Sequence, residues 1–310
     1  KIKGMGGKNL TVGTNNLPVR VIAEDGSEKV YIVKVTRREA INIFGKSYEV
    51  IEKEPTLTTS SNNTSDESGL YKSTATNTSN PTYYFRGNVT NNYVTFAGYT
   101  WRIVRVNEDG TIRIVMQDGI NNNEYKFNSS TNNYSYMYYS NSNAKTTLNS
   151  WYQTNIGSKS ELSQKVATGE YCEQAKAKSS SSITSLNASM TVYTDYTPNF
   201  KCTTDGNEKG IVNAKVGLLS YDEVVHAGGY LNKSNSNYYL YNSSIAWWSM
   251  SPDGHAGSTL SICVWYVNTS GLISYSSVNN ALHLRAVLNL TADTLATGSG
   301  TSTDPFVISS

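Results

Sequence analysis

Cysteine and histidine are the residue types in this chain best suited to nucleophilic chemistry, and there are only three of each. Cys263 could act as a thiolate with His255 or His283 as its base, since a nucleophilic cysteine needs a partner that lowers its thiol pKa and an exposed, electropositive setting. The stretch LSICVWYV, however, alternates like a strand and places Cys263 on the same side as Trp265. This pattern is typical of a small buried residue, so we expect Cys263 to pack in the core.

The adjacent acids Asp222 and Glu223 could form a carboxylate pair for glycoside hydrolysis. Neighbouring helix positions point about 100° apart, however, and neither acid has a partner carboxylate in a recognisable motif. We interpret both as acids of a helix N-terminus, and His226 as a capping or surface histidine near the end of the same helix. The histidines show no HxxxH or HxH spacing, so the sequence predicts no metal site and no cofactor.

Cys172 and Cys202 bracket a loop rich in Ser and Thr, which favours a disulfide in an exported protein. Closing that loop would stabilise the fold by roughly 3 to 4 kcal/mol. The alternative is a pair of reduced, buried cysteines in a cytosolic protein.

The surface is predicted to be polar with little charge, because charged residues make up only 16% of the chain, against about 25% in ordinary soluble domains. A net charge of +2 offers no basic field for nucleic acid and no polybasic patch for a membrane. No apolar run approaches about 18 residues, and the first residues lack the apolar centre of a signal peptide. We therefore expect an excised, soluble piece of a larger protein without a membrane span.

Residues 1–38 are predicted to contain a β-hairpin with one buried face. Apolar residues alternate in LPVRVIA and in VYIVKV, and a turn at Asp25-Gly26 joins the two runs. With the Asn-rich turn before them, these residues resemble the C-terminal half of a cadherin-like β-sandwich domain of bacterial surface proteins. Because the strands that should precede Lys1 are absent, this half-sandwich is expected to be either trimmed or paired with something else.

Residues 39–65 are predicted to add one or two strands and a linker rich in Ser, Thr and Asn, before a single domain over 66–310. In that domain, alternation around an Asn107–Gly110 turn predicts an antiparallel hairpin. Residues 121–150 predict a long, exposed, irregular excursion. Helical spacing in TTLNSWYQTNI, SELSQKVATGEYCEQ and VGLLSYDEVVHAGG predicts helices, and the remainder returns to strands. Strands with a few short helices favour the α+β class.

The order of motifs over 66–310 resembles bacterial surface domains with the C-type lectin-like fold, of the variety found in formylglycine-generating enzymes. The motifs are YYFRGNVTNNYVTFAGYTWRIVRVNEDGTIRIV, VGLLSYDEVVHAGG, WWSMSP, a spaced Trp265, Val267 and Gly271, and LRAVLNL. Members usually read Arg-Pro-Val where this chain has Arg285-Ala286-Val287, a departure that concerns packing. The resemblance implies antiparallel sheets with a few short helices, and a framework in which Arg285 holds a carboxylate or carbonyl in the interior. The framework residues are Trp247, Trp248, Pro252, Trp265 and Arg285.

Two activities of this fold do not carry over to the chain. Ca²⁺-dependent sugar binding needs a Glu-Pro-Asn or Gln-Pro-Asp loop and a Trp-Asn-Asp strand, because Ca²⁺ takes about six to eight oxygen ligands. Neither motif is present. The formylglycine-generating enzymes use a cysteine pair near the C-terminus, where this chain has only Cys263.

We expect no catalysis. The alternative is a Cys263-dependent transpeptidase or hydrolase, since TLSIC and the downstream Arg285 resemble the corresponding residues of sortases.

The window from Asp253 to His283 contains no Lys, Glu, Gln or Met. Its Tyr, Ser, Gly and Asn residues are those that antibody-type binding surfaces use. C-type lectin-like domains also carry variable regions rewritten by diversity-generating retroelements, in which randomised AAC or AAT codons never yield Lys, Glu, Gln, Met or Trp. Trp265 is the exception and is assigned to the framework; the alternative is an ordinary sheet edge with loops. The residues predicted to bind a ligand are Asp253, His255, Ser258, Tyr266, Asn268, Ser270, Tyr275, Asn279, Asn280 and His283.

The sequence thus predicts an extracellular recognition protein of a bacterial cell surface or phage particle. Its partner would be a protein or glycan on another cell or host surface, and nucleic acid is not expected to bind. A structural spacer in a surface layer or pilus is a further alternative. The sequence predicts neither the ligand nor the oligomeric state.

Overall fold

The structure is a computed structural model that describes residues 2–4, 9–55, 57, 66–173, 198–202, 210–231, 233–253 and 262–309. Strands account for 41% and helices for 14%, so the protein is mostly β-sheet with a few short helices. The predicted combination of β-sheets with a few short helices is confirmed at this level. The sheets also contain parallel pairs, such as that of β5 (Lys46–Ile51) with β6 (Gly69–Ser73) and that of β15 (Tyr230–Leu231) with β18 (Leu272–Ser277).

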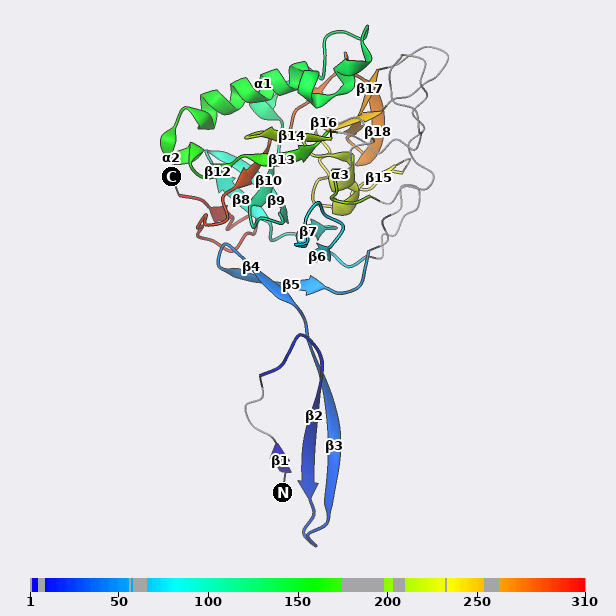
Figure 1. Cartoon of the computed structure of the whole chain (residues 1–310), viewed down its shortest axis with the longest axis vertical. Coiled ribbons are helices and arrows are strands. Elements are labelled where there is room, and N and C mark those ends of the chain that lie inside the picture. The colour runs from blue at the N-terminus through cyan, green and yellow to red at the C-terminus, as the bar shows by residue number, and fades with distance from the viewer. Residues whose placement is uncertain are drawn as a thin grey trace.

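A long β-hairpin projects from one end of the molecule (Figure 1). Strands β2 (Gly13–Ile22) and β3 (Glu28–Arg37) pair antiparallel over their full length, and β1 (Ile2–Gly4) adds to the edge of β2. The turn between them needs Gly26 at φ 84°, a conformation that glycine adopts without a Cβ clash. The Asp25 carboxylate accepts hydrogen bonds from the Ser27 backbone and hydroxyl.

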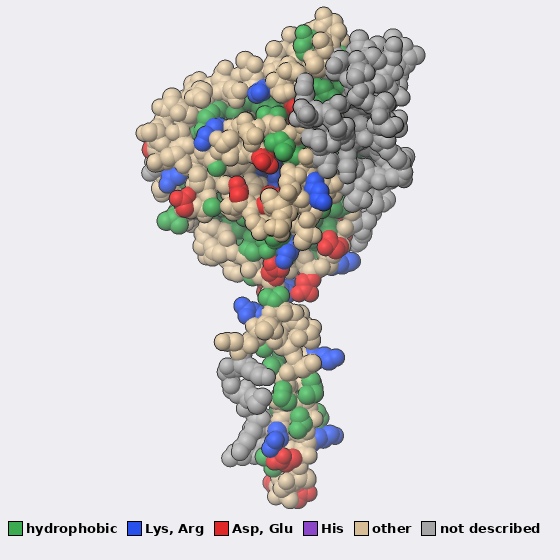
Figure 2. All heavy atoms as spheres, in the orientation of Figure 1, with side chains coloured by type: hydrophobic (Ala, Val, Ile, Leu, Met, Phe, Trp, Pro, Cys, Tyr) green, Lys and Arg blue, Asp and Glu red, His purple; other side chains and the backbone are tan. Residues whose placement is uncertain are grey.

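The prediction that this hairpin buries one face is wrong for the described residues. Successive β3 side chains point to opposite sides, yet Val30, Tyr31, Ile32 and Val33 are 55%, 48%, 56% and 44% exposed. Hydrophobic side chains accordingly appear on the surface of the hairpin (Figure 2). The physical reason is that no second layer of described residues packs over this small sheet.

The head, residues 40–309, is built on a ten-stranded sheet. Its strands run in the order β12-β20-β10-β9-β7-β6-β5-β4, with β8 on β9 and β21 on β8. The bounds are β4 Ala40–Ile43, β5 Lys46–Ile51, β6 Gly69–Ser73, β7 Thr82–Arg86, β8 Tyr93–Phe96, β9 Tyr99–Val106, β10 Ile112–Met116, β12 Val166–Ala167, β20 Val287–Leu290 and β21 Phe306–Val307. The predicted hairpin around Asn107–Gly110 is β9–β10, with Gly110 at φ 83°.

The extra strands predicted within 39–65 are β4 and β5, and they belong to the sheet of the head. β5 pairs in parallel with β6 through Val50 and Leu70, and both side chains are buried. β5 therefore joins the segment 39–65 to the larger unit by strand pairing. Most of the predicted linker, residue 56 and residues 58–65, lies outside the described part of the chain.

A second sheet of six strands has the order β11-β19-β16-β17-β18-β15. Its strands are β11 Glu124–Lys126, β15 Tyr230–Leu231, β16 Trp247–Asp253, β17 Cys263–Val267, β18 Leu272–Ser277 and β19 Ala281–His283. A separate antiparallel pair joins β13 (Gly169–Cys172) to β14 (Ile211–Ala214).

In the part of the chain that the structure describes, three α-helices accompany the sheets: α1 Asn143–Tyr152, α2 Ser160–Ser163 and α3 Tyr221–Ala227. α3 is the helix predicted from VGLLSYDEVVHAGG; the Ser220 hydroxyl caps its start, and Gly228 at φ 118° ends it. Short 3₁₀ turns lie at 120–122, 134–137 and 139–141, and a π turn continues α1 over 153–157. No helix in the described ranges is long and apolar enough to cross a membrane.

The predicted exposed excursion over 121–150 is wrong in part. It holds β11, two 3₁₀ turns and most of α1, and it buries Phe127, Met137 and Tyr139 completely or nearly so. Phe127 packs against Trp248 with ring centroids 5.7 Å apart. The apolar residues are too widely spaced among Asn and Ser to show a regular period in the sequence.

Candidate functional site

A buried ion network ties α3 to the main sheet. Glu223 Oε1 accepts hydrogen bonds from Arg105 of β9, at 3.2 Å, and from Arg113 of β10, while its Oε2 accepts from the Ser220 backbone N at 3.0 Å. Burial alone would raise the pKa of Glu223, but the two guanidinium charges and the Ser220 hydrogen bond lower it to about 2. Glu223 is therefore a charged structural anchor, consistent with its prediction as a helix N-terminal acid.

The interpretation of His226 as a capping or surface histidine is wrong. Its side chain is buried, with Nδ1 2.8 Å from the Asp222 carbonyl and the ring 4.1 Å from that of Phe200. Burial lowers the pKa of His226 to about 3, so the imidazole is neutral. Arg86 contacts the end of α3 instead, donating to the Val225 and His226 carbonyls at 2.8 and 3.0 Å.

The adjacent tryptophans of β16 belong to the interior. Trp247 and Trp248 are 1% and 0% exposed, and the Arg285 guanidinium lies 4.8 Å from the Trp247 ring. Arg285 donates to the Met116 and Leu240 carbonyls, each at 2.8 Å. Pro252 and Trp265 are buried as well. All five residues assigned to the framework thus lie in the core, and Arg285 holds carbonyls there.

The register of the second sheet separates two tyrosines that were predicted to share a binding surface. Tyr275 of β18 lies opposite Trp265 of β17, whereas Tyr266 lies opposite Ser274 and Trp248. Successive residues point to opposite sides of a strand, so Tyr275 and Tyr266 lie on opposite faces of the sheet. Tyr275 is 44% exposed, and Tyr266 is partly buried against Trp248, 6.2 Å away.

The predicted polar residues lie at both ends of the β17–β18 hairpin. Asn268 and Ser270 form the turn between the strands, where the Asn268 carboxamide oxygen accepts from the Ser270 backbone and hydroxyl and from the Leu272 backbone. Asn279 and Asn280 are exposed beyond the far end of β18. A six-residue strand separates these turns by about 20 Å, so one small ligand cannot contact both.

Asp253 lies beneath the surface where β16 ends, opposite Cys263. It is only 3% exposed, and its Oδ2 has no hydrogen-bond partner in the described part of the chain. Burial raises the pKa of Asp253 to about 7. Burial and the nearby Asp253 charge raise the pKa of the Cys263 thiol to about 12, and Cys263 is 2% exposed. Cys263 therefore lies in the core, as its strand pattern predicts.

The other residues predicted to bind a ligand are His283, His255 and Ser258. His283 of β19 lies with Nδ1 4.0 Å from Glu124 Oε1 of β11, next to Gly119. His255 and Ser258 fall outside the described residues. Of the predicted ligand residues, Tyr275, Asn279 and Asn280 are exposed near one end of β18, and we call them the β18 patch; the Asn280 side chain donates to Ser276 Oγ at 2.8 Å, on the strand face opposite Tyr275.

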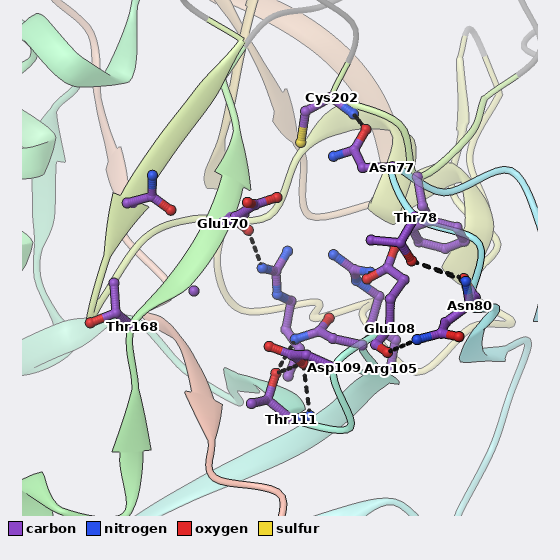
Figure 3. Close-up of a pocket in the computed structure, with 15 residues that line it drawn as sticks. Asn77, Thr78, Asn80, Arg105, Glu108, Asp109, Thr111, Thr168, Glu170 and Cys202 are labelled. Atoms are coloured by element: carbon purple, nitrogen blue, oxygen red, sulfur yellow. Dashed lines mark hydrogen bonds and ion pairs between the residues drawn. The ribbon is translucent and has the colours of Figure 1, made fainter.

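The structure also contains a polar cavity that the sequence patterns did not indicate. Its volume is about 390 Å³, and Figure 3 shows Arg105, Thr168, Glu170 and Cys202 on different sides of it. The lining comes from the loop after β6, the β9–β10 hairpin, the β12–β13 connection, β14, and Phe200 and Cys202 of the described segment 198–202. Its lining includes Arg105, Asn107, Glu108, Asp109, Arg113, Thr168 and Glu170.

The predicted disulfide forms at the edge of this cavity. Cys172 at the end of β13 is bonded to Cys202, and the Cys202 backbone donates to the Asn77 side chain at 3.0 Å. The disulfide thus joins β13 to Cys202, and the backbone hydrogen bond of Cys202 links it in turn to Asn77 in the loop after β6. The prediction of a Cys172–Cys202 bridge is confirmed.

Among the described side chains, no three His, Cys, Asp or Glu residues gather into a metal-binding group. Comparison of the chain with protein-family models, with curated proteins and with solved structures finds no match. The C-type lectin-like and cadherin-like assignments therefore stay predictions from the sequence.

Proposed function

We propose that this chain is a non-catalytic recognition protein of a bacterial cell surface or phage particle. A C-type lectin-like head binds a protein or glycan ligand through its C-terminal surface, and the projecting hairpin corresponds to the C-terminal part of a cadherin-like β-sandwich domain that serves as a stalk. The burial of Trp247, Trp265 and Arg285 supports the head assignment, since these residues carry the resemblance as framework positions. The Cys172–Cys202 disulfide supports an extracellular location.

The observation that carries the proposal is an exposed tyrosine whose ring packs against buried aromatic side chains. Tyr275 is 44% exposed, and its ring stacks edge-on against the buried Trp265 at 5.9 Å. Trp265 in turn packs on Tyr221 of α3 at 5.2 Å. A tyrosine held this way offers a large contact area at a low entropic cost, and the small polar residues beside it adapt their hydrogen bonds to a partner.

The environment of Cys263 supports a role without chemistry. A nucleophilic cysteine works as an accessible thiolate, whereas the Cys263 thiol is buried beside the Asp253 carboxyl and its pKa lies far above neutrality. Exposure of the folded protein to iodoacetamide at neutral pH should leave Cys263 unmodified. Rapid alkylation coupled to loss of a turnover would favour the transpeptidase or hydrolase alternative.

Binding through the β18 patch is tested with one variant and a matched control. Labelled protein is applied to a printed glycan array and to intact bacterial and epithelial cells. Tyr275→Ala should weaken the retained binding by about tenfold or more, because an anchoring tyrosine contributes more than about 1.4 kcal/mol. Tyr31→Ala removes an equally exposed tyrosine from the hairpin, 48% against 44%, and should change nothing. Equal binding of both variants, or no saturable binding at all, would favour the spacer alternative.

Retroelement diversification is part of the same proposal and has its own test. Sequencing of this locus across a population of the source should show substitutions at exposed positions such as Ser270, Tyr275, Asn279 and Asn280. The buried Trp247, Trp248, Trp265 and Arg285 should not vary. An invariant window would leave a recognition protein of fixed specificity.

A further inference from the structure

The polar cavity beside the disulfide is lined by two residues that each carry a polar atom without a partner in the described chain, and of these two atoms Asn107 Oδ1 is the buried one. Arg105 is 5% exposed; its Nε and Nη1 donate to Glu223, Thr82 and Glu108, while Nη2 has no acceptor among the described residues. Asn107 also lines the cavity, and its Oδ1 is buried without a donor. An unsatisfied donor and an unsatisfied acceptor thus belong to residues that line one space.

The orientation of the Asn107 carboxamide follows from its neighbours. The Arg113 Nε can only donate, and it donates to Asn289 Oδ1 at 3.0 Å. The Asn107 atom 2.8 Å from that same oxygen must therefore be the nitrogen, Nδ2, which also lies 2.8 Å from Thr111 Oγ1. The unpartnered atom is consequently the oxygen, and exchanging O and N would place two acceptors against each other.

The charge around the cavity disfavours an anion. Arg105 and Arg113 line it together with the carboxylates of Glu108, Asp109 and Glu170, and Glu223 lies behind the two arginines. Among the described residues around the cavity, acids therefore outnumber bases, an arrangement that does not favour phosphate or carboxylate groups. The arrangement does not suit an apolar ligand either, because the Phe200 ring is 4% exposed and the Arg105 guanidinium lies 5.0 Å from it.

We infer that this cavity is a second binding site, for a small neutral saccharide. A hydroxyl group is both donor and acceptor, so a sugar hydroxyl that accepts from Arg105 Nη2 can also donate to a carboxylate of the lining, such as that of Glu108 or Asp109. The exposed side chains of Asn77, Thr78, Asn80 and Asn213 at the rim supply further donors and acceptors. The volume of about 390 Å³ falls in the range of roughly 300 to 1,000 Å³ that small-molecule sites occupy. This site is separate from the β18 patch and does not depend on it.

The test is calorimetric titration of the whole chain with glucose, galactose, mannose, N-acetylglucosamine, maltose and lactose, and with inorganic phosphate as an anionic probe. At least one sugar should bind saturably at millimolar concentration. Thr168→Trp should weaken that binding by about tenfold or more, because the indole occupies the cavity. Thr168 is exposed and makes no hydrogen bond through its side chain in the described chain, so this variant should keep its thermal unfolding midpoint.

Two further variants separate this inference from the proposed function. Thr154→Trp is the matched control, since Thr154 is an exposed threonine outside the cavity, and it should bind the sugar as the unmodified chain does. Tyr275→Ala should also leave sugar binding unchanged. The inference is overturned if no sugar binds, if Thr168→Trp and Thr154→Trp bind equally well, or if phosphate binds in place of the sugars.

Discussion

Single side chains in this protein gain their properties from burial more than from their sequence neighbours. Asp253 and Glu223 are both carboxylic acids with exposures of 3% and 4%, yet burial raises the pKa of the first to about 7 while two arginines lower that of the second to about 2. The difference is the presence of compensating charge. No described residue places a positive charge close enough to Asp253 to lower its pKa. At neutral pH the burial of Asp253 is therefore less favourable than that of Glu223.

Asp253 should make the protein less stable as the pH rises. Its folded pKa of about 7 lies above the unfolded value of 3.8, so between these values the folded state binds a proton that the unfolded state has lost. The free energy of unfolding therefore falls as the pH rises from about 4 to 7, by up to a few kcal/mol. Asp253→Asn removes this dependence, which urea unfolding across that range measures.

The control for this pH dependence is Asp109→Asn, which changes an exposed aspartate in the β9–β10 turn. It should keep the pH profile of the unmodified chain. If Asp253→Asn and the unmodified chain show parallel profiles from pH 4 to 7, Asp253 is not protonated in the folded state near neutrality and the assignment is wrong.

At the scale of elements, α3 is anchored at both ends by arginines of the main sheet. Arg105 and Arg113 hold Glu223 at its start, and Arg86, which is paired with Asp66 at 2.9 Å, holds the carbonyls at its end. A helix of seven residues is too short to be stable alone. Its position therefore depends on these cross-element contacts and on its buried apolar residues.

Glu223→Gln should destabilise the fold by about 3 to 5 kcal/mol, because it removes the carboxylate that Arg105 and Arg113 share and leaves Glu108, 3.4 Å from Arg105, as the remaining described acid paired with these two buried charges. Glu161→Gln is the control, since Glu161 is an exposed acid in the first turn of α2, and its effect should stay within about 0.5 kcal/mol. The midpoint of urea unfolding reports both. Similar midpoints for the two variants would show that the network contributes little.

At the scale of the molecule, the head and the projecting hairpin differ in how their strands are supported. β9 and β10 lie inside a wide sheet with buried side chains, whereas β3 is exposed along nearly its whole length. A narrow sheet without a covered face is marginally stable. Opening of the hairpin should therefore need less free energy than opening of the head.

Hydrogen exchange measures this difference within one sample. Backbone amides of 14–36 that pair β2 with β3 should exchange faster than those of 101–116, because the hairpin opens locally while the main sheet opens only with the head. Equal protection would mean that another layer, such as a second copy of the chain, covers the hairpin in solution.

The sequence alone indicated much of the local structure. Alternation and turn glycines predicted the β2–β3 and β9–β10 hairpins, and Ser220, Glu223 and Gly228 are typical limits of a short helix. These features depend on residues close together in the chain, so their physical causes can be read locally. The same holds for the burial of Cys263, which follows from its position in an apolar strand.

Only the tertiary structure decided where these pieces meet. The register of β17 and β18 placed Tyr266 and Tyr275 on opposite faces, although both stood in one predicted binding window. The polar cavity brings together residues from 77 to 213 whose side chains resemble ordinary turn and surface residues in the sequence. Strand pairing, ion networks and cavities arise from contacts between distant segments, and burial there determines which side chains are charged, satisfied or available to a ligand.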